Sequence, residues 1–410
     1  MIITMNKTRT RFAPSPTGYM HIGNLRTALF EFLIAKHEGG DFLLRIEDTD
    51  QERKVEGAVD VIYKTLKECG LNWDEGPDIG GDFGPYVQSE RLPMYKGYAE
   101  DLIKLGGAHY CFCSEEEIEA QRKEAESLGI SFKFNDPCKH LSAEEVQAKL
   151  DAGEPYVIRQ TIKDVGETYF DDEVYGRIEV DGDVLDEQIL IKSDGYPTYN
   201  FANIIDDHQM QISHVVRGNE YLSSTPKYNL IYDAYGWQRP TYVHVPPVMK
   251  DEHHKLSKRN GDASFQDLVA KGYLPDAIMN YIALLGWAPE TEQEIYTLDE
   301  LIKVFNIHRI SKSPAIFDID KLTWMNGVYL RNMDEETYYE TVRPYLEKAV
   351  HGPYNLKEIA KIIQPRIDIL NQIEESVDFF DTLVDYDLEM YRHKKMKTTP
   401  EVALKALKAS

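Results

Sequence analysis

A histidine, a glycine and an asparagine stand together where a helix is expected to begin. The segment His21-Ile-Gly-Asn24 follows the turn Ala13-Pro-Ser-Pro-Thr-Gly18, and apolar residues at helical spacing start at Ile22. Backbone N–H groups at a helix N-terminus have no partner and the helix dipole is positive there, so an anion such as a phosphate is favoured. Gly23 leaves room for a base or a ribose, and His21 can donate to a phosphate oxygen. Taken alone, the pattern also fits a tight turn with a surface histidine.

Two lysines lie far downstream in Lys255-Leu-Ser-Lys258-Arg259, directly before Asn260-Gly261. Asn-Gly favours a turn, so we expect these lysines on a loop rather than on a rigid element. Ammonium groups on a loop can close over phosphates and stabilise the charge that grows in a transition state, an effect of about 3 kcal/mol per group. For this segment alone, a solvated basic loop is the alternative.

Three of the four cysteines cluster with a histidine. Cys111-Phe-Cys113 is followed after 24 residues by Cys138-Lys-His140. Three thiolates and one imidazole complete a tetrahedral zinc site, which would be structural because no position is left for water. The alternative is three reduced cysteines without metal. The fourth cysteine, Cys69, is expected to pack at the end of a helix.

The first fifty residues predict the βαβ unit that would position the His21 segment. A strand ends near Phe12, a helix runs from Ile22, and Gly39-Gly40 stops it. The apolar run at 42–46 is typical of a buried parallel strand. Strand-like segments return at 214–216 and 242–245 and would complete an open α/β sheet. Beyond about 265 the pattern is helical, most clearly at 276–285, 298–305 and 356–370.

Composition and charge set limits on the class of protein. With 42% hydrophobic and 11% aromatic residues the chain is typical of globular proteins, and no segment has the length or hydropathy of a membrane span. We expect a cytoplasmic protein, because no leader segment is recognisable. The net charge of −24 argues against a polyanionic partner unless basic residues are gathered locally.

Together the motifs resemble those of a known enzyme class. The pairing of His21-Ile-Gly-Asn24 with Lys255-Leu-Ser-Lys258-Arg259 resembles the HIGH and KMSKS signatures of class I aminoacyl-tRNA synthetases. Asn24, Leu256 and Arg259 depart from those signatures, whereas His21, Lys255 and Lys258 are kept. Four more segments narrow the resemblance to bacterial-type glutamyl-tRNA synthetases: Arg11-Phe-Ala-Pro-Ser-Pro-Thr-Gly18, Leu44-Arg-Ile-Glu-Asp-Thr-Asp50, Gly195-Tyr-Pro-Thr-Tyr199 and Val216-Arg-Gly-Asn-Glu220.

The resemblance implies a glutamate–tRNA ligase. Such an enzyme activates L-glutamate with ATP and Mg²⁺ to glutamyl-adenylate, after tRNA has bound, and transfers glutamate to the 3′ end of tRNA-Glu. It leaves open whether tRNA-Gln is also charged. It also implies a structural Zn²⁺ held by Cys111, Cys113, Cys138 and His140, and a monomer. Glutaminyl relatives differ at the segments 14–17 and 47–50, which favours glutamate over glutamine as the substrate.

The family pattern assigns roles to residues of this chain. His21, Lys255 and Lys258 would be catalytic, and Glu47 would bind the α-ammonium group of glutamate. Arg11 and Arg217 would bind its carboxylates, since arginine suits bidentate carboxylate binding, although the sequence leaves open which arginine takes which. Glutamine would be rejected because its amide leaves a buried guanidinium unpaired. The implied glutamate site comprises Arg11, Ala13, Ser15, Glu47, Tyr199 and Arg217, and the ATP site Thr17, Gly18, His21, Gly23, Asn24, Glu220, Lys255, Ser257 and Lys258.

The fold class expected from the resemblance is α/β. A Rossmann-like catalytic domain would occupy 1–106 and 196–250, interrupted at 107–195 by an inserted α+β subdomain that binds the acceptor stem and zinc. A stem-contact domain would follow at 251–328, with Phe317, Leu322 and Trp324 expected in its core. The remainder, 329–410, would be an all-α anticodon-binding domain. Because the family continues into further helices, we expect the natural protein to be longer.

Three rival functions fit this sequence less well. A short paralogue that glutamylates a modified tRNA base would lack the helical region 330–400. An inactive RNA-binding relative should have lost His21, Glu47 or Lys258, and none is lost. For a nucleotidylyltransferase, the paired arginines and the helical region would have no purpose.

Overall fold

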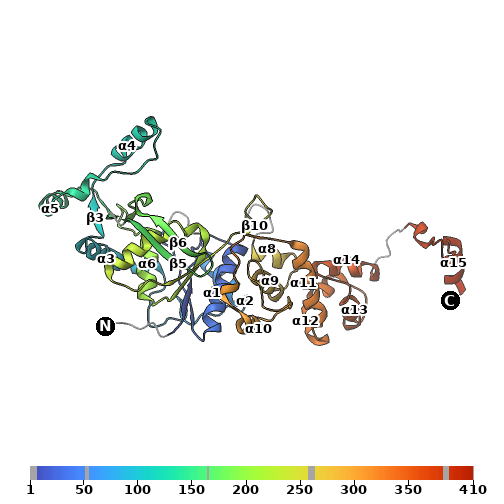
Figure 1. Cartoon of the computed structure of the whole chain (residues 1–410). Coiled ribbons are helices and arrows are strands. Elements are labelled where there is room, and N and C mark those ends of the chain that lie inside the picture. The colour runs from blue at the N-terminus through green and yellow to red at the C-terminus, as the bar shows by residue number, and fades with distance from the viewer. Residues whose placement is uncertain (1–6, 51–54, 164–165, 257–263, 382–386, 410) are drawn as a thin grey trace. The chain divides into compact units, whose positions relative to one another are not determined.

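The computed structural model describes residues 7–50, 55–163, 166–256, 264–381 and 387–409 (Figure 1). The chain divides into two compact units. One contains Met1–Ala270 and Leu274–Leu322, and the other contains Lys271–Tyr273 and Thr323–Ser410. Among the described residues, no helix has both the length and the apolar character needed to cross a bilayer.

The chain opens with the expected βαβ unit. Strand β1 (Arg9–Phe12) pairs in parallel with β2 (Asp41–Leu44), and helix α1 (Ile22–His37) connects them. All four residues of β1 are buried, as expected for a central strand. The turn after α1 requires glycine, because a Cβ at Gly40 would lie 2.0 Å from the carbonyl oxygen of Thr8.

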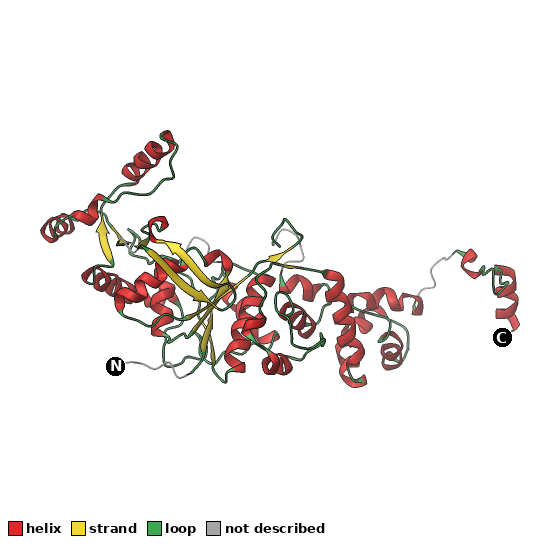
Figure 2. Ribbon diagram, in the orientation of Figure 1, coloured by secondary structure: helices red, strands yellow, loops and turns green. Residues whose placement is uncertain are grey.

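Strands from the second half of the unit form a larger core sheet beside the pair β1–β2. Strand β8 (His214–Gly218) is parallel to β9 (Thr241–Val245), and next to it the N–H of Ser213 donates to the carbonyl of Arg9 at the start of β1 (3.0 Å). Helix α6 (Tyr199–Gln209) precedes β8, and α7 (Thr225–Tyr235) connects β8 to β9. Figure 2 shows these strands flanked by helices. The Rossmann-like sheet predicted from the sequence is therefore present.

The segment expected as an insertion, 107–195, does not form one separate body. Strands β3 (Ala108–Cys111), β4 (Val157–Gln160) and β7 (Ile189–Ile191) make their own antiparallel sheet. The hairpin of β5 (Glu167–Asp172) and β6 (Gly176–Asp181) instead extends the core sheet, because Asp172 pairs with Tyr242 of β9. The sheet β3–β4–β7 packs against α3 (Leu92–Lys104), α6 and α7 through a shared apolar cluster.

Further helices belong to the first unit. Helix α4 (Glu115–Ser127) and α5 (Ala143–Asp151) each begin with a Ser/Glu capping box, which satisfies their first N–H groups. Helix α2 (Ala58–Glu68) ends at the buried C-cap Cys69, as expected. The part beyond β9 contains β10 (Val248–Met249), α8 (Phe265–Ala270), α9 (Pro275–Ala283), α10 (Leu298–Val304) and β11 (Ala315–Ile316).

The second unit is helical. It contains most of α11 (Ile319–Asn332), then α12 (Glu335–Ala349), α13 (Leu356–Ile363), α14 (Ile373–Val377) and α15 (Pro400–Ala409). Two sequence predictions are wrong here. Trp324 is 46% exposed, because α11 buries Met325 and Leu330 instead, whereas Leu322 is buried and Phe317 half-buried. The helix expected at 356–370 already ends at Ile363, two residues before Pro365.

Candidate functional site

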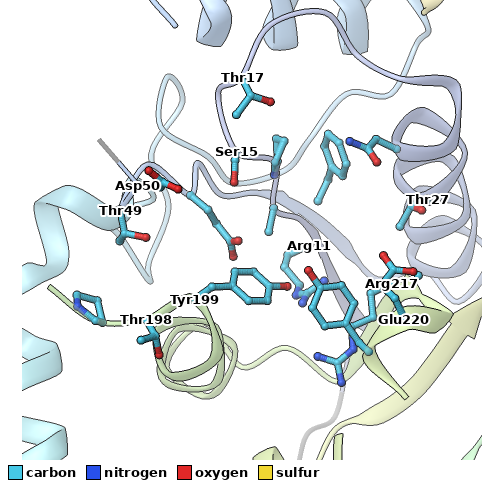
Figure 3. A pocket seen from close by; sticks show the side chains of 18 of the residues that line it. Arg11, Ser15, Thr17, Thr27, Thr49, Asp50, Thr198, Tyr199, Arg217 and Glu220 are labelled. Carbon is cyan, nitrogen blue, oxygen red and sulfur yellow. The ribbon is translucent and has the colours of Figure 1, made fainter. Parts of the chain in front are cut away.

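Strands β1, β2 and β8 lead into one cavity of about 1090 Å³ (Figure 3). In open α/β sheets, ligands bind at the carboxyl ends of the parallel strands, and residues 11–14, 47, 49, 50 and 216–218 line this cavity. All six residues expected to bind glutamate also line it: Arg11, Ala13, Ser15, Glu47, Tyr199 and Arg217. Segments that are more than 200 residues apart in the sequence therefore converge on one cavity.

The residues expected to bind ATP are divided. Thr17, Asn24 and Glu220 line the cavity, whereas Gly18, His21, Gly23 and Lys255 are not among its lining residues. Lys255 is exposed, in a segment held to β10 by a hydrogen bond from the N–H of Leu256 to the carbonyl of Val248 (3.2 Å). Ser257 and Lys258 lie outside the described residues.

His21 connects the two signature segments. It is the N-cap of α1, and its Nδ1 accepts a hydrogen bond from the N–H of Gly23 (3.0 Å). Since Nδ1 is an acceptor, Nε2 carries the proton and donates to the carbonyl oxygen of Leu256 (3.0 Å). The histidine is thereby held beside the helix N-terminus and the start of the lysine segment.

Arg11 has its charge neutralised by buried acids on two helices. Its Nε and Nη2 donate to the two carboxylate oxygens of Asp207 on α6 (2.8 and 3.2 Å). Nη1 donates to Glu31 on α1 (3.2 Å) and to the carbonyl of Val216 (3.4 Å). All three nitrogens of this guanidinium are therefore used within the protein.

Arg45 extends this cluster to Glu47. Its Nη1 donates to Asp207 (2.8 Å) and its Nη2 to Glu47 (3.0 Å), and all three side chains are buried. Burial raises the pKa of Glu47 to about 7, although Arg45 and Arg11 act in the opposite direction. For Asp207, burial would raise the pKa, but the two arginines outweigh it and lower the pKa. Of the two carboxyl groups hydrogen-bonded to Arg45, Glu47 and not Asp207 therefore changes its charge near neutral pH.

Arg217 on β8 is surrounded differently. Its Nε donates to Nε2 of His244 (3.1 Å) and its Nη2 to the hydroxyl of Thr225 (2.7 Å). The guanidinium carbon lies 4.8 to 5.5 Å from the ring centroids of three tyrosines, Tyr221, Tyr228 and Tyr242. Within the described part of the chain, no carboxylate forms an ion pair with Arg217. The side chain thus carries a buried positive charge toward the cavity with no internal counter-charge.

Sequence analysis did not identify several residues that support this site. Arg45 lies inside the motif 44–50 and could have been noticed there, but Glu31, Asp207, Thr225 and His244 occur in ordinary helix or strand positions. Their roles depend on partners 8 to 196 residues away on other elements, so no local spacing signals them.

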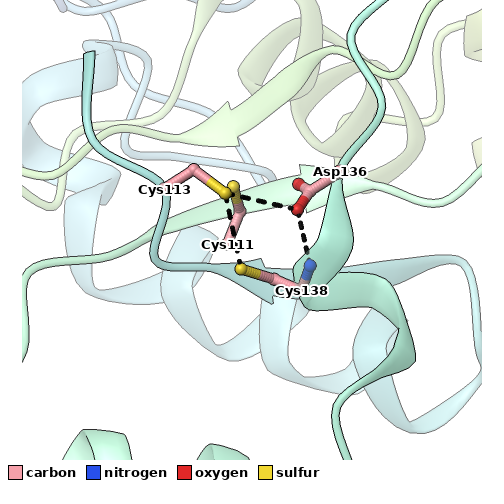
Figure 4. A group of neighbouring side chains, drawn as sticks. All are labelled: Cys111, Cys113, Asp136 and Cys138. Atoms are coloured by element: carbon pink, nitrogen blue, oxygen red, sulfur yellow. Dashed lines mark hydrogen bonds between the residues drawn. The ribbon is translucent and has the colours of Figure 1, made fainter. Parts of the chain in front are cut away.

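The three expected cysteines lie together, but the fourth group beside them is a carboxylate (Figure 4). The possible ligand atoms of Cys111, Cys113, Asp136 and Cys138 all lie within 4.8 Å of one another. His140, the ligand expected from the sequence, is exposed and is not part of this group. The reason is local: Asp136 caps the short helix Pro137–His140, so its carboxylate accepts from the N–H of Cys138 (2.9 Å) and turns toward the sulfurs.

The donor set fits a zinc ion. The sulfurs of Cys113 and Cys138 are 3.6 Å apart, close to the edge of about 3.8 Å expected for a tetrahedron with Zn–S bonds of about 2.3 Å. Burial raises the pKa of the Cys111 thiol to about 11 and also raises the pKa of Cys113. A bound cation would reverse this effect, because zinc binds the thiolate form.

Comparisons with known proteins cover almost the whole chain. Residues 7–324 match the family described as "tRNA synthetases class I (E and Q), catalytic domain", and residues 337–410 match an anticodon binding domain. A glutamate–tRNA ligase of Clostridium botulinum is 60% identical over 402 residues, which are 98% of this chain and 83% of that protein. The glutamate–tRNA ligase of Clostridium acetobutylicum is also 60% identical, with the same coverage.

A solved structure agrees with these matches. It is a glutamate–tRNA ligase from Elizabethkingia meningosepticum crystallised with its amino acid, which is 36% identical and superposes with a TM-score of 0.90. The match covers 98% of this chain and 85% of that protein. The fold described above is therefore shared over both units.

Proposed function

The chain belongs to the glutamate–tRNA ligases, which are class I aminoacyl-tRNA synthetases, and from this membership we propose roles for the residues around the cavity. The reaction activates glutamate with ATP and transfers it to tRNA-Glu. One observation carries the assignment of the amino-acid site: the same cavity contains a buried acid, Glu47, and a buried guanidinium without a counter-charge, Arg217.

Glutamate carries an ammonium group and two carboxylates, and each has a matching partner. Glu47 accepts the α-ammonium group, because it lines the cavity and Arg45 holds one of its oxygens, Oε1. Arg217 takes the side-chain carboxylate, since the α-carboxylate must stay available to attack ATP and a fixed guanidinium contact would hinder it. Arg11 lines the cavity beside Glu47 and Arg217 and supplies a fixed positive charge, because its nitrogens already donate to Asp207 and Glu31.

Activation and transfer depend on positioning and charge. The α-carboxylate attacks the α-phosphate, pyrophosphate leaves, and glutamyl-adenylate forms; the ribose hydroxyl of the tRNA then attacks the carbonyl carbon and AMP leaves. His21 at the N-terminus of α1, with Lys255 and Lys258, stabilises the negative charge on the phosphates. Thr17, Gly18, Gly23, Asn24, Glu220 and Ser257 contact the nucleotide. Mg²⁺ enters with ATP and neutralises phosphate charge.

Exchange of pyrophosphate into ATP tests the role proposed for Lys258. With glutamate and tRNA-Glu present, Lys258→Ala should lower the exchange rate by about 100-fold, as expected for losing one group that stabilises the transition state. Lys64→Ala is a matched control, because Lys64 is an exposed lysine on α2 whose ion pair is with the exposed Glu68. A wild-type rate in Lys258→Ala would exclude this role, and omitting tRNA measures whether activation depends on it.

We also propose that the cysteine cluster holds a structural zinc ion. Cys111, Cys113 and Cys138 supply three thiolates, and the fourth ligand is either Asp136, which lies among the sulfurs, or His140, which follows Cys138 by two residues. Zinc content measured on Asp136→Asn and His140→Ala separates the two, since only loss of the true ligand should lower the metal stoichiometry. A zinc-free wild-type protein prepared with zinc in the medium would contradict the proposal.

The tRNA specificity and the assembly state follow from the same proposal. We propose tRNA-Glu as the substrate and a monomer as the active form. Aminoacylation of tRNA-Glu and tRNA-Gln in parallel measures how far the specificity extends, and light scattering of the active sample measures the mass.

A further inference from the structure

A histidine outside the cavity lies between a carboxylate and the cavity arginine. Both oxygens of Asp172, at the end of β5, are used as acceptors: Oδ1 by the N–H groups of Val174 and Tyr175 (3.0 and 2.8 Å), and Oδ2 by the backbone N–H and Nδ1 of His244 (3.1 and 2.6 Å). Only an ionised carboxylate accepts from every one of these donors. Asp172 therefore fixes the proton of His244 on Nδ1.

This tautomer leaves Nε2 of His244 as an acceptor, and Nε of Arg217 donates to it (3.1 Å). Thr225 does not compete for Nε2, because its single hydroxyl proton is used by the carbonyl of Tyr221 (2.9 Å) and its oxygen accepts from Arg217 (2.7 Å). His244 and Thr225 thus hold one edge of the guanidinium. Nη1 forms no hydrogen bond with any described residue and remains for a ligand.

We propose that Asp172 and His244 are positioning residues for glutamate: they hold Arg217 in the orientation that receives the side-chain carboxylate. This inference rests on the proposed role of Arg217. Neither Asp172 nor His244 lines the cavity, and both are fully buried, so they act on the substrate only through the arginine. Because Nε2 is an acceptor and bears no charge, it orients the guanidinium without neutralising it.

The arrangement makes glutamate binding sensitive to the protonation of His244. A proton on Nε2 would face the guanidinium with a second cation and remove its acceptor. The groups around the imidazole are Asp172, Arg217, Thr225, the rings of Phe170 and Tyr242, and, at longer range, the charge of Glu220. Burial lowers the pKa of His244 below its ordinary value, and Arg217 acts in the same direction, so the neutral form prevails at physiological pH.

Two variants of His244 test the proposal in the full chain with tRNA-Glu. In His244→Asn, the shorter amide can replace Nδ1 toward Asp172 but cannot reach Arg217. In His244→Gln, the amide oxygen reaches the position of Nε2 and can accept from Arg217. At pH 7.5 we expect KM for glutamate to rise about 10- to 100-fold in His244→Asn, as for loss of one hydrogen bond to a charged group, and less than threefold in His244→Gln. KM for ATP should stay within twofold in both.

The pH profile gives the second readout. In a pH profile from 8 to 5, KM for glutamate should rise more steeply in the wild type than in His244→Gln only below pH 6.5, because the pKa of His244 is lowered from that ordinary value. The ratio of the two KM values cancels the contribution of Glu47. Equal KM for glutamate in all three proteins, equal increases in both variants, or an equal rise in KM for ATP would overturn the proposal. Wild-type aminoacylation in the same assay establishes the proposed function independently, and thermal unfolding confirms that the variants are folded.

Discussion

Arg11 on β1 and Arg217 on β8 are two buried arginines on adjacent strands, and their surroundings are opposite. Arg11 is 4% exposed and bonds to the carboxylates of Asp207 and Glu31, whereas Arg217 is 6% exposed and is held by an imidazole, a hydroxyl and three tyrosine rings. Burying a charge without a counter-charge is costly. The contrast is the basis for our proposal that the first arginine stabilises the core and the second binds the carboxylate of the substrate.

The largest effect on stability should come from removing Arg11, the arginine that is paired with buried acids. Arg11→Met leaves Asp207 and Glu31 buried with less compensation, so we expect the free energy of unfolding to fall by about 3–5 kcal/mol. Urea unfolding followed by circular dichroism measures this. A variant as stable as the wild type would mean that the buried acids do not depend on Arg11.

Arg217→Gln should show the reverse pattern. We expect kcat/KM for glutamate to fall about 100-fold, or ~2.7 kcal/mol, because the substrate carboxylate loses a charged partner. Stability should stay close to that of the wild type, since no internal carboxylate is left unpaired. Aminoacylation kinetics and urea unfolding on one preparation test both parts, and a loss of stability like that of Arg11→Met would remove the distinction between the two arginines.

Glu47 lines the same cavity as Arg11 and Arg217. Its raised pKa predicts that glutamate binding depends on pH. Burial raises that pKa to about 7, so below pH 7 the free enzyme holds a proton that must leave before an α-ammonium group can bind. Affinity for glutamate should therefore be fully present above pH 7 and should fall by up to about tenfold per pH unit below it. Calorimetric titration with glutamate between pH 8 and 5.5 measures this. In Glu47→Gln this dependence should vanish, with weak binding throughout.

The smallest expected effect concerns Glu31, which is compared with Asp207, the other acid bound to Arg11. Burial raises the pKa of Glu31 well above the ordinary value, and its Oε2 has no hydrogen-bond partner among the residues that the structure describes. The neutral isostere in Glu31→Gln should therefore change the free energy of unfolding by less than about 1 kcal/mol, since one oxygen still accepts from Arg11. Asp207→Asn, measured alongside, should cost about 3 kcal/mol, because two arginines lose their carboxylate. If the two variants were equally unstable, Glu31 would be ionised in the folded protein.

How far the sequence predicted the site depends on whether the signal was local. The motifs 11–18, 44–50, 195–199 and 216–220 contain the six residues expected to bind glutamate, and all six line one cavity. The partners that define their chemistry, such as Asp207 and His244, come from elements that meet only in the tertiary fold. Ligand spacing likewise predicted His140, whereas the cap formed by Asp136 turns a carboxylate toward the sulfurs.

Strand pairing was also beyond sequence patterns. The range 107–195 was expected as one insertion, yet β5 reaches the core sheet and places Asp172 beside His244. The alternation of a strand shows which face is buried but not which strand it will pair with.

The tyrosine rings around Arg217 have a consequence for inhibitor chemistry. Ring faces attract a cation without supplying a formal negative charge. The guanidinium of Arg217, about 5 Å from the ring of Tyr228, can therefore still bind an anion. A glutamate analogue whose side chain ends in a sulfonate would remain ionised at every pH at which the enzyme is active and would keep this contact. An analogue with an ester or a nitrile at the same place would offer Arg217 only a dipole and should bind more weakly than one with a full negative charge.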